Sequence, residues 1–387
     1  MLDKNNKQFS RKADSVVVHG YQGCDPLTGA ISYPIYQTST YKNPGLNSNI
    51  QFSYSRCDNP TRFELENTVA LLEGGTAGFA FASGLAAVTA TFSLLKSGEH
   101  VVVSDDIYGG SYRQIEELWK HFGVEFTYVD VGDTEAVKAA VQSNTKMIYL
   151  ESPTNPMMKV ADIAAIAEIS KACGALLVVD NTFLTPYFQK PIALGADIVI
   201  HSGTKFLAGH HDTTAGFVVV NSEALEKRMG LILRTEGSGL APFDSWLLLR
   251  GIKTLALRMR RHEENAVKVA AFLKNHPAVE KVYFVGDKDH PSYDVTCRQT
   301  TGFGGMISFA IKDASKVEQV LCGGDMIMFA ESLGGTATLI TYPQTQTHAS
   351  IPAEIRNRIG ITDRLIRLSV GIEDAEDIIA DLKKMLG

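Results

Sequence analysis

The sequence predicts an α/β protein, with a large domain built on a mostly parallel sheet and a smaller α+β domain after it. The first observation is length, because 387 residues exceed what one hydrophobic core usually holds. The second is an alternation of β-branched runs with helical patterns between about residues 75 and 220, which is typical of a parallel sheet flanked by helices. The third is a change of pattern near residue 245, where a long apolar and basic helix is expected over 246–259.

Five short apolar runs are expected to be strands that are buried on both faces of the sheet. They are His100 to Val103, Met147 to Leu150, Leu176 to Val179, Ile198 to Ile200 and Phe217 to Val220. Helical spacing of three and four residues lies between them, over 85–95 and 163–169. Asp162 is a suitable N-cap for the second of these helices, and Gly174 is suited to end it.

These patterns divide the chain into three parts. Residues 1–55 are polar, rich in Asn, Tyr, Pro and Gly, and weakly periodic, so we expect an extended arm that packs on a neighbouring protomer. Residues 56–245 are expected to form the sheet domain, and residues 246–387 the C-terminal domain. In the latter, Ile378, Leu382 and Met385 are predicted to share one stripe of the last helix, after a strand containing Leu368 and Val370.

Composition narrows the class of protein. The net charge of −6 is the opposite of the cationic face that nucleic acids require, so no nucleic-acid partner is expected. The five cysteines are scattered without a CxxC pair, which predicts reduced thiols and neither a zinc cluster nor a disulfide framework. The chain has no apolar signal segment at its start and no run of about 20 apolar residues. We therefore expect a cytoplasmic protein without a membrane partner.

Polar residues follow the predicted strands at the point where each strand ends. Asp180 comes directly after one strand and Lys205 shortly after another, so both side chains are expected to face one crevice. A lysine can form a Schiff base with the aldehyde of pyridoxal 5′-phosphate (PLP), and an aspartate can keep the pyridine nitrogen protonated. The alternative is a structural ion pair between Asp180 and Lys205, which strand-end position alone does not exclude.

A glycine turn at the start of the first helix indicates a phosphate site. The segment Ala82-Ser83-Gly84-Leu85-Ala86-Ala87 would expose backbone N–H groups, which bind dianions at helix N-termini. Ser202 and Thr204 flank the turn of the lysine and offer two hydroxyls. A small-residue turn before a helix is also common in simple packing, so the turn by itself does not decide between the two interpretations.

Several motifs, in their order along the chain, resemble one known family. They are Tyr54-Ser55-Arg56-Cys57-Asp58-Asn59-Pro60-Thr61, Ser83-Gly84-Leu85-Ala86-Ala87, Tyr108-Gly109-Gly110, Asp180-Asn181-Thr182, His201-Ser202-Gly203-Thr204-Lys205 and Glu331-Ser332-Leu333-Gly334-Gly335. Over nearly its whole length the chain resembles the Cys/Met-metabolism PLP-dependent enzymes of trans-sulfuration, such as the cystathionine β-lyases and γ-lyases. The resemblance implies PLP as the cofactor, a large domain of the PLP-dependent transferase-like type (fold type I), and residues 56–245 as the PLP-binding domain.

The resemblance also implies a role for each matching residue. Lys205 is implied to carry the cofactor and to move the substrate α-proton, and Asp180 to pair with the pyridine nitrogen. Tyr108 is implied to stack on the ring and to act as a base towards the incoming amine, and Asn155 to lie beside the ring hydroxyl. The other roles concern the two anionic groups. The implied phosphate ligands are Gly84, Leu85, Ser202 and Thr204 with Tyr54 and Arg56 of an adjacent protomer, and the implied ligands of the substrate carboxylate are Ser332 and Arg367.

The expected activity is cleavage of a carbon–sulfur bond in a small sulfur amino acid, namely β-elimination of cystathionine to homocysteine, pyruvate and ammonia. Gly110 stands where methionine γ-lyases typically carry a cysteine, and Ala337 stands where many γ-lyases and γ-synthases carry a glutamate. The segment 340–348 looks most like the cystathionine β-lyases of Gram-positive bacteria. Cystathionine γ-lyase and γ-synthase stay open as alternatives, and methionine γ-lyase is less favoured.

Two other classes of protein compete with this interpretation. A nicotinamide-dependent oxidoreductase needs a G-x-G-x-x-G fingerprint, which the sequence lacks. A non-catalytic PLP-binding protein is opposed by the intact set of Lys205, Tyr108 and Arg367. No metal site is expected, because the adjacent residues His210, His211 and Asp212 would rarely converge on one ion.

The predicted role of the arm determines the smallest oligomer that we expect to be active. If Tyr54 and Arg56 complete the phosphate site of a neighbour, the smallest active unit is a dimer. The resemblance implies a homotetramer formed from two such dimers.

Overall fold

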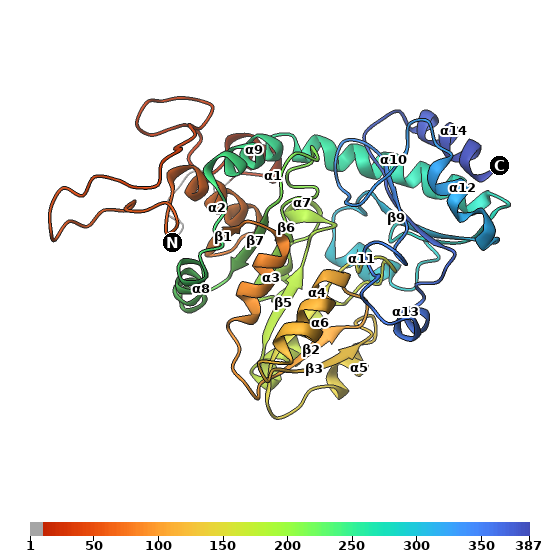
Figure 1. Cartoon of the computed structure of the whole chain (residues 1–387), viewed down its shortest axis with the longest axis horizontal. Helices are drawn as coiled ribbons and strands as arrows, with labels where there is room; N and C mark the ends of the chain where they lie inside the picture. Colours follow the sequence, from red (N-terminus) through yellow and green to blue (C-terminus); the bar gives the residue numbers. More distant parts are fainter. Residues whose placement is uncertain (1–10) are drawn as a thin grey trace.

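The computed structural model describes residues 11–387 and contains two sheets, one in each domain (Figure 1). The large sheet has seven strands in the order β1-β7-β6-β5-β4-β2-β3. The strands β2, β3, β4, β5 and β6 run parallel to one another. β7 is antiparallel to its two neighbours, β6 and β1. Their bounds are β1 Ala77–Phe81, β2 His100–Ser104, β3 Glu125–Val129, β4 Thr145–Glu151, β5 Leu176–Asp180, β6 Ile198–Ser202 and β7 Gly216–Val220.

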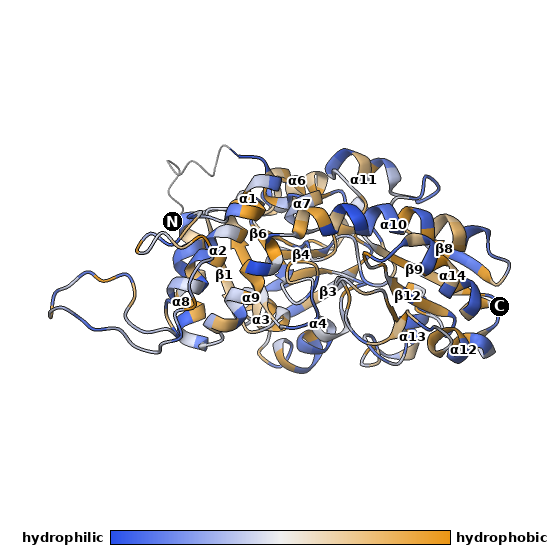
Figure 2. Ribbon diagram, turned by 90° about the horizontal axis from the view of Figure 1, so that it is seen from above, coloured by the Kyte–Doolittle hydropathy of each residue, from blue (hydrophilic) through white to orange (hydrophobic). Residues whose placement is uncertain are grey.

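Helices cover both faces of this sheet, because its strands bury apolar side chains on both sides. In β2, Val102 packs into one apolar cluster, and Val101 and Val103 pack into another on the opposite face. Figure 2 shows these hydrophobic strands enclosed between helices with polar outer faces. The helices up to residue 236 are α1 Ala13–His19, α2 Pro60–Glu73, α3 Gly84–Phe92, α4 Gly109–Gln114, α5 Thr134–Ala139, α6 Ile163–Cys173, α7 Thr185–Phe188 and α8 Glu223–Glu236.

The predicted α/β fold is confirmed, and all five predicted strands are present. The predicted caps of α6 are also confirmed, since the Asp162 side chain accepts a hydrogen bond from the Ala165 N–H and Gly174 is left-handed at φ 68°. Two strands of the large sheet were not predicted. β1 is rich in small residues, and β3 is an edge strand that is only half buried, so neither has the continuous β-branched run that marks the other five.

The C-terminal domain has a five-stranded sheet in the order β10-β11-β12-β9-β8, which confirms the predicted smaller α+β unit. Ile378, Leu382 and Met385 of its last helix are fully buried, as the predicted stripe requires. The strands are β8 Val279–Tyr283, β9 Met306–Ile311, β10 Met328–Phe329, β11 Leu339–Thr341 and β12 Leu365–Ser369, and the helices after residue 290 are α11 Tyr293–Gln299, α12 Val317–Cys322, α13 Ala353–Ile359 and α14 Ala375–Leu386.

The single long helix predicted over 246–259 is wrong, because the chain forms two helices there, α9 Pro242–Ile252 and α10 Leu255–Asn275. Their apolar spacing continues across the break at Thr254, which hides it in the sequence. The longer α10 joins the two domains (Figure 1). Its buried Arg258 donates hydrogen bonds to the backbone oxygens of Phe206 and Leu207, so α10 also anchors the segment that follows Lys205.

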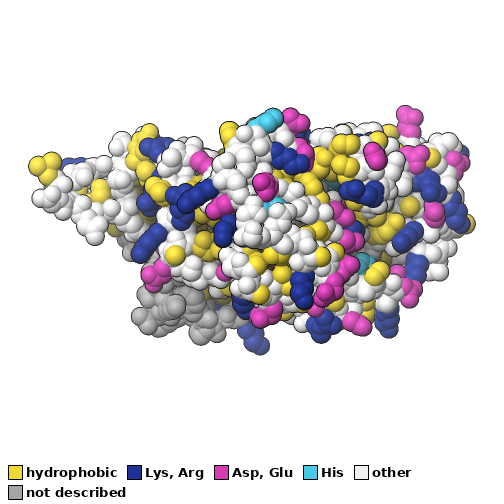
Figure 3. Space-filling view, turned by 90° about the horizontal axis from the view of Figure 1, so that it is seen from below, with side chains coloured by type: hydrophobic (Ala, Val, Ile, Leu, Met, Phe, Trp, Pro, Cys, Tyr) yellow, Lys and Arg dark blue, Asp and Glu magenta, His cyan; other side chains and the backbone are white. Residues whose placement is uncertain are grey.

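The arm extends away from the body of the molecule (Figure 1). The predicted extended arm over 1–55 is wrong for residues 13–19, which form α1 with Val16 and Val17 buried, and its residues 1–10 lie outside the described part of the chain. Residues 20–59 form a non-helical segment with a bridge between Thr40 and Tyr54 and a hydrogen bond from the Tyr36 N–H to Thr61 Oγ1 of α2. Several apolar side chains of this segment are exposed, among them Leu27, Ile31 and Leu46. Figure 3 shows the tip of the arm as mainly hydrophobic and uncharged atoms, which suits contact with another protein surface.

Candidate functional site

A cavity of about 240 Å³ lies where β4, β5 and β6 end, between the large sheet and the C-terminal domain. Both domains contribute to its wall. It is lined by Ser83, Gly84, Leu85, Val88, Tyr108, Ser111, Glu151, Asn155, Asp180, Thr182, Phe183, Ser202, Thr204, Lys205, Thr214, Glu331, Ser332, Leu333, Thr347 and Arg367.

A larger groove of about 630 Å³ lies between the loop at 130–133 and the segment at 279–292. The charges along it neutralise one another, since Lys159 pairs with two aspartates and Lys274 with two others. The strand-end cavity contains buried charged groups without such partners. We therefore treat the smaller cavity as the candidate active site.

Lys205 lies in the turn that follows β6, with its Nζ 2.9 Å from Ser332 Oγ. Burial, assisted by the nearby charge of Arg367, lowers the pKa of the Lys205 amine to about 8. A larger fraction of this amine is therefore unprotonated near neutral pH than in an exposed lysine. An unprotonated amine can attack a carbonyl or accept a proton, which is the chemistry predicted for Lys205.

Asp180 ends β5, in register with Glu151 at the end of β4. Oδ1 of Asp180 accepts hydrogen bonds from the backbone N (3.0 Å) and Oγ1 (2.5 Å) of Thr182. Burial raises the pKa of Asp180, although Thr182 opposes the change, and burial together with Asp180 raises the pKa of Glu151 well above its usual value. Two buried carboxyl groups side by side favour a cation next to them. The nearest rival interpretation fails, because the Lys205 amine bonds Ser332 and makes no ion pair with Asp180.

The glycine turn before α3 lies at the cavity where the phosphate site is predicted. Ser83 caps the helix by accepting a hydrogen bond from the Ala86 N–H, and the N–H groups of Gly84 and Leu85 precede the first intrahelical bonds. A Cβ on Gly84 would lie only 3.0 Å from the Ser202 side chain, so glycine permits the close approach of these two segments. Thr204 is nearby, with its Oγ1 bonded to the backbone of Ala215. Backbone donors and hydroxyls thus meet at the positive end of a helix.

Tyr108 lines the cavity just before α4 and keeps 40% of its surface exposed. Its backbone N–H donates a hydrogen bond to Glu151 Oε2 at 3.0 Å. Its ring lies over Gly110, where a Cβ would come within 2.4 Å of the ring carbon Cε1. Glycine at position 110 is therefore required by the orientation of the Tyr108 ring in this chain.

Arg367 lies on β12 and is 1% exposed. Its Nη1 donates to Asn155 Oδ1 at 2.9 Å and its Nη2 to the carbonyl oxygen of Ser332 at 3.0 Å, while its buried Nε has no hydrogen-bond partner. Burial lowers the pKa of Arg367 to about 10, which leaves it charged at neutral pH. No described carboxylate forms an ion pair with it. A buried guanidinium in this state is a site for an anion.

Tyr54 and Arg56 lie outside the cavity, on the exposed turn that precedes α2. Tyr54 is 45% exposed, and the Arg56 guanidinium lies 5.4 Å from the centre of the Tyr54 ring. All other predicted site residues line the cavity of the single chain. The prediction that these two serve an adjacent protomer is compatible with their position and stays a prediction.

Some residues of the cavity were not among the predicted site residues. Glu151 and Thr182 follow strand ends as Asp180 does, so strand-end position was a signal that could have found them. His348 lies behind the cavity lining and is buried, and its Nε2 lies 2.9 Å from the carbonyl oxygen of the lining residue Asn155, which it helps to fix. His348 is distant from Asn155 in the sequence, and no spacing pattern indicated this contact.

The described residues do not indicate a metal or a membrane segment. Across 11–387, no three His, Cys, Asp or Glu side chains are grouped as metal ligands, and no helix combines the length and apolarity needed to cross a bilayer. His210 bonds the carbonyl oxygen of Ala208, and the ring of His211 packs against Gly335.

The residues present fit PLP. A helix N-terminus with two hydroxyls suits its phosphate, a buried carboxyl held by Thr182 suits its protonated ring nitrogen, and a buried lysine suits its aldehyde. An α/β fold whose strand-end cavity combines these three features is typical of PLP-dependent enzymes.

Comparison with known proteins makes the assignment more specific. The model of the Cys/Met metabolism PLP-dependent enzyme family matches residues 14–387, and the chain belongs to this family. It is 50% identical over 375 residues to cystathionine gamma-lyase of Bacillus subtilis, covering 97% of this chain and 99% of the relative. It is also 50% identical over 370 residues to cystathionine beta-lyase of Lactococcus lactis, covering 96% and 97%. The crystal structure of cystathionine gamma-lyase from Lactobacillus plantarum with L-serine has a TM-score of 0.95 at 47% identity, covering 97% of this chain and 98% of that one.

Proposed function

We propose that this enzyme cleaves cystathionine by β-elimination, consuming water and releasing homocysteine, pyruvate and ammonia. The observation that carries the proposal is the unpaired guanidinium of Arg367, which faces the same small cavity as the Lys205 amine. An amino acid whose carboxylate binds Arg367 would bring its α-carbon towards Lys205. The arrangement therefore supports proton transfer at the α-carbon of an amino acid.

Each polar group has a distinct task in this proposal. Bound PLP supplies an electron sink that stabilises negative charge at the substrate α-carbon. Lys205 holds the cofactor, takes the α-proton and returns a proton later, for which its lowered pKa is suited. Asp180, oriented by Thr182, holds the proton of the ring nitrogen. Tyr108, which lines the cavity, would hold the ring and would accept a proton from the incoming amine.

The anionic groups are held at two ends of the cavity. Gly84, Leu85, Ser202 and Thr204 bind the phosphate. Ser332 and Arg367 bind the substrate carboxylate, and Asn155, bonded to Arg367, would bind the ring hydroxyl. Tyr54 and Arg56 of an adjacent protomer complete the phosphate site, which makes a dimer the smallest active unit and a tetramer of two dimers the expected assembly.

Preference for β-elimination is supported by the segment 336–338, which follows the cavity residues Ser332 and Leu333 along the chain. Thr338 is bound by Glu373 through both its N–H (2.6 Å) and its hydroxyl (2.8 Å), which fixes this segment. Ala337 then presents a methyl group, and no acidic side chain at this position is available to hold a distal substrate amine.

Product analysis tests the proposal. Purified enzyme with cystathionine should accumulate pyruvate and homocysteine, and a Lys205→Ala variant should form neither. Accumulation of 2-oxobutyrate and cysteine would instead establish γ-elimination. That second candidate is favoured by the similarity, also at 50% identity, to cystathionine gamma-lyase of Bacillus subtilis.

A further inference from the structure

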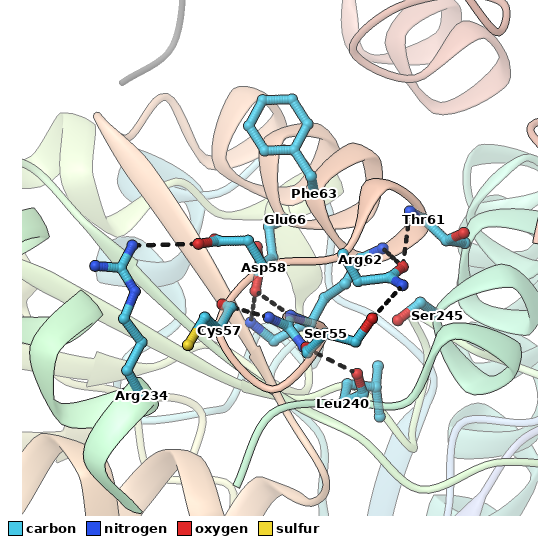
Figure 4. Close-up of polar contacts among 12 residues, drawn as sticks. Ser55, Cys57, Asp58, Thr61, Arg62, Phe63, Glu66, Arg234, Leu240 and Ser245 are labelled. Carbon is cyan, nitrogen blue, oxygen red and sulfur yellow. Dashed lines mark hydrogen bonds and ion pairs between the residues drawn. The ribbon is translucent and has the colours of Figure 1, made fainter. Parts of the chain in front are cut away.

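The turn that carries Tyr54 and Arg56 is hydrogen-bonded on its inner side to a buried arginine, Arg62 (Figure 4). Arg62 lies in the first turn of α2 and is 2% exposed. Its Nη1 donates to the carbonyl oxygen of Ser55 at 2.9 Å, and its Nη2 donates to the carbonyl oxygen of Cys57 at 2.6 Å. The two accepting residues flank Arg56, so the guanidinium fixes the backbone on both sides of that residue.

These hydrogen bonds determine which way the turn faces. The carbonyl groups of Ser55 and Cys57 point inward to Arg62, whereas the side chains of Tyr54 and Arg56 are exposed. A planar guanidinium can bind two carbonyl oxygens at once in a fixed geometry, which the single ammonium of a lysine cannot reproduce. The outward orientation of both side chains is thus linked to these two hydrogen bonds of Arg62.

A buried counter-ion fixes Arg62 in turn. Glu66 lies one helical turn further along α2, with its Oε1 3.2 Å from Arg62 Nε, and it also accepts a hydrogen bond from the Ala80 N–H of β1 at 2.9 Å. Burial raises the pKa of Glu66 to about 7, and the charge of Arg62 opposes that rise. Arg62 Nη1 also donates to the carbonyl oxygen of Leu240 at 3.5 Å, and the Leu240 N–H donates to the carbonyl oxygen of Ala80 in the same strand. The turn is therefore connected to the large sheet.

The outer contacts of the turn are weaker. Asp58 and Arg234 form an ion pair of 3.4 Å between exposed side chains, and Arg56 donates to the carbonyl oxygen of Arg234. Exposed pairs of this kind contribute little to stability because water and salt screen them. The buried Arg62 is therefore a stronger support for the turn than these exposed contacts. It acts together with the buried Asn59, whose Nδ2 donates to Ser55 Oγ at 3.1 Å, and with the bridge between Thr40 and Tyr54.

We propose that Arg62, with Glu66 as its counter-ion, is a positioning residue that presents Tyr54 and Arg56 to the phosphate site of a neighbouring protomer. The inference rests on the proposed function, in which the site is shared between two chains. It predicts that a substitution of Arg62 lowers PLP binding and turnover at the site of the neighbouring chain and leaves both unchanged at the site of its own chain.

Mixed oligomers provide the test, because they separate the two sites. One chain carries Arg56→Ala and an intact Lys205, and the other carries Lys205→Ala and an intact turn. The two chains carry different tags, so that oligomers containing both can be isolated. In these oligomers, each restored site combines Lys205 of the first chain with the turn of the second chain. Arg62→Lys is then added either to the second chain, which donates the turn, or to the first, whose turn is already inactive.

Two quantities are measured for both placements. One is the rate of cystathionine turnover, and the other is the amount of cofactor that borohydride fixes to Lys205 at limiting PLP. Arg62→Lys in the turn donor should lower both by on the order of 10- to 100-fold, as expected for a misplaced binding group. The same change in the other chain should leave both unchanged. Because the mixed oligomers contain the same set of substitutions, their unfolding temperatures should agree.

A double variant tests whether the loss of activity comes from misfolding of the chain. Removing both buried charges with Arg62→Met and Glu66→Met avoids leaving one charge unpaired, which is the costly event in a buried pair. In the turn donor, this variant should unfold at a temperature close to that of the parent and still fail to restore the site.

Two other results would contradict the proposal. Equal losses in the two placements, or no loss in either, would overturn the role of Arg62 while the shared site stands. No activity in the parent mixture, with both single variants folded, would overturn the shared site itself and the inference with it.

Discussion

The two halves of the candidate site are held in different ways. Asp180, Lys205 and Arg367 are fixed within one chain by strands, or by turns directly after them, and they face a common cavity. Tyr54 and Arg56 lie on an exposed turn whose backbone is held by Arg62. One chain therefore builds most of the cavity by folding alone, whereas its proposed completion requires a second chain.

This difference has a thermodynamic consequence. Contacts within one chain form with the fold and do not depend on protein concentration. Contacts contributed by a neighbour depend on association, so dilution should weaken them first. Substitutions in the two halves should accordingly differ in size of effect, in rescue by mixing and in dependence on assembly.

The largest effect is expected at Lys205, in the strand-end half. Lys205→Ala should lower turnover by about 10³-fold or more, because it removes both the cofactor attachment and the proton carrier. The unfolding temperature should stay close to that of the wild type, since one cavity side chain contributes little to the core. Lys316→Ala, at an exposed lysine in the C-terminal domain, serves as the control in both assays. Wild-type rates in Lys205→Ala would refute the proposed mechanism.

Arg367 should give the next largest effect. Arg367→Lys keeps the charge but loses the fork that binds Asn155 and the Ser332 carbonyl, so kcat/KM should fall by on the order of 10²- to 10³-fold. Mixing this variant with Lys205→Ala should restore no activity, because both residues belong to the same chain's half of the cavity. Activity recovered in that mixture would place Arg367 in the half that a neighbour supplies.

Arg56 should give a smaller effect that mixing can reverse. Arg56→Ala should weaken PLP retention by about 10- to 100-fold, which is typical for loss of one charge-assisted hydrogen bond. Titration of PLP into the cofactor-free protein measures this change, and Arg298→Gln, at an exposed ion pair with Asp162, is the matched control. Activity should return on mixing with Lys205→Ala, in contrast to Arg367→Lys. Persistent inactivity of that mixture would argue against a shared site.

The smallest expected effect is a shift in pH dependence. The pKa of Lys205 is lowered to about 8, so the fraction of neutral amine, and with it the rate of covalent PLP capture by cofactor-free protein, should rise with pH and level off above about pH 8. Arg367 contributes to this lowering, so Arg367→Gln should move the midpoint to higher pH. Stopped-flow absorbance over a pH series measures it. A midpoint that stays in place or moves down would contradict the proposed coupling.

The strand-end half was accessible from the sequence because its signals are local. A β-branched run predicts a buried strand, and Asp180 and Lys205 follow such runs, so the order of residues alone predicts that the two side chains converge. The resemblance to a family then supplied Ser332 and Arg367, which come from the other domain. β1 and β3 were missed because small residues and an exposed edge weaken the same signal.

The contacts that hold the site in place were not accessible in the same way. Arg62 binds carbonyl groups of Ser55 and Cys57, and its charge and position on α2 do not distinguish it from a surface arginine in the sequence. The contact of His348 with the Asn155 backbone joins segments that are distant along the chain. Backbone acceptors leave no mark in the side-chain pattern, so only the folded arrangement shows these contacts.

Mapping the cofactor attachment tests the account most directly. The enzyme is reduced with borohydride, digested, and the modified peptide is identified by mass spectrometry. We predict one phosphopyridoxyl group per chain, on Lys205, with loss of the label in Lys205→Ala. A label on another lysine, or an unlabelled protein that still cleaves cystathionine, would contradict the assignment of this cavity as the active site.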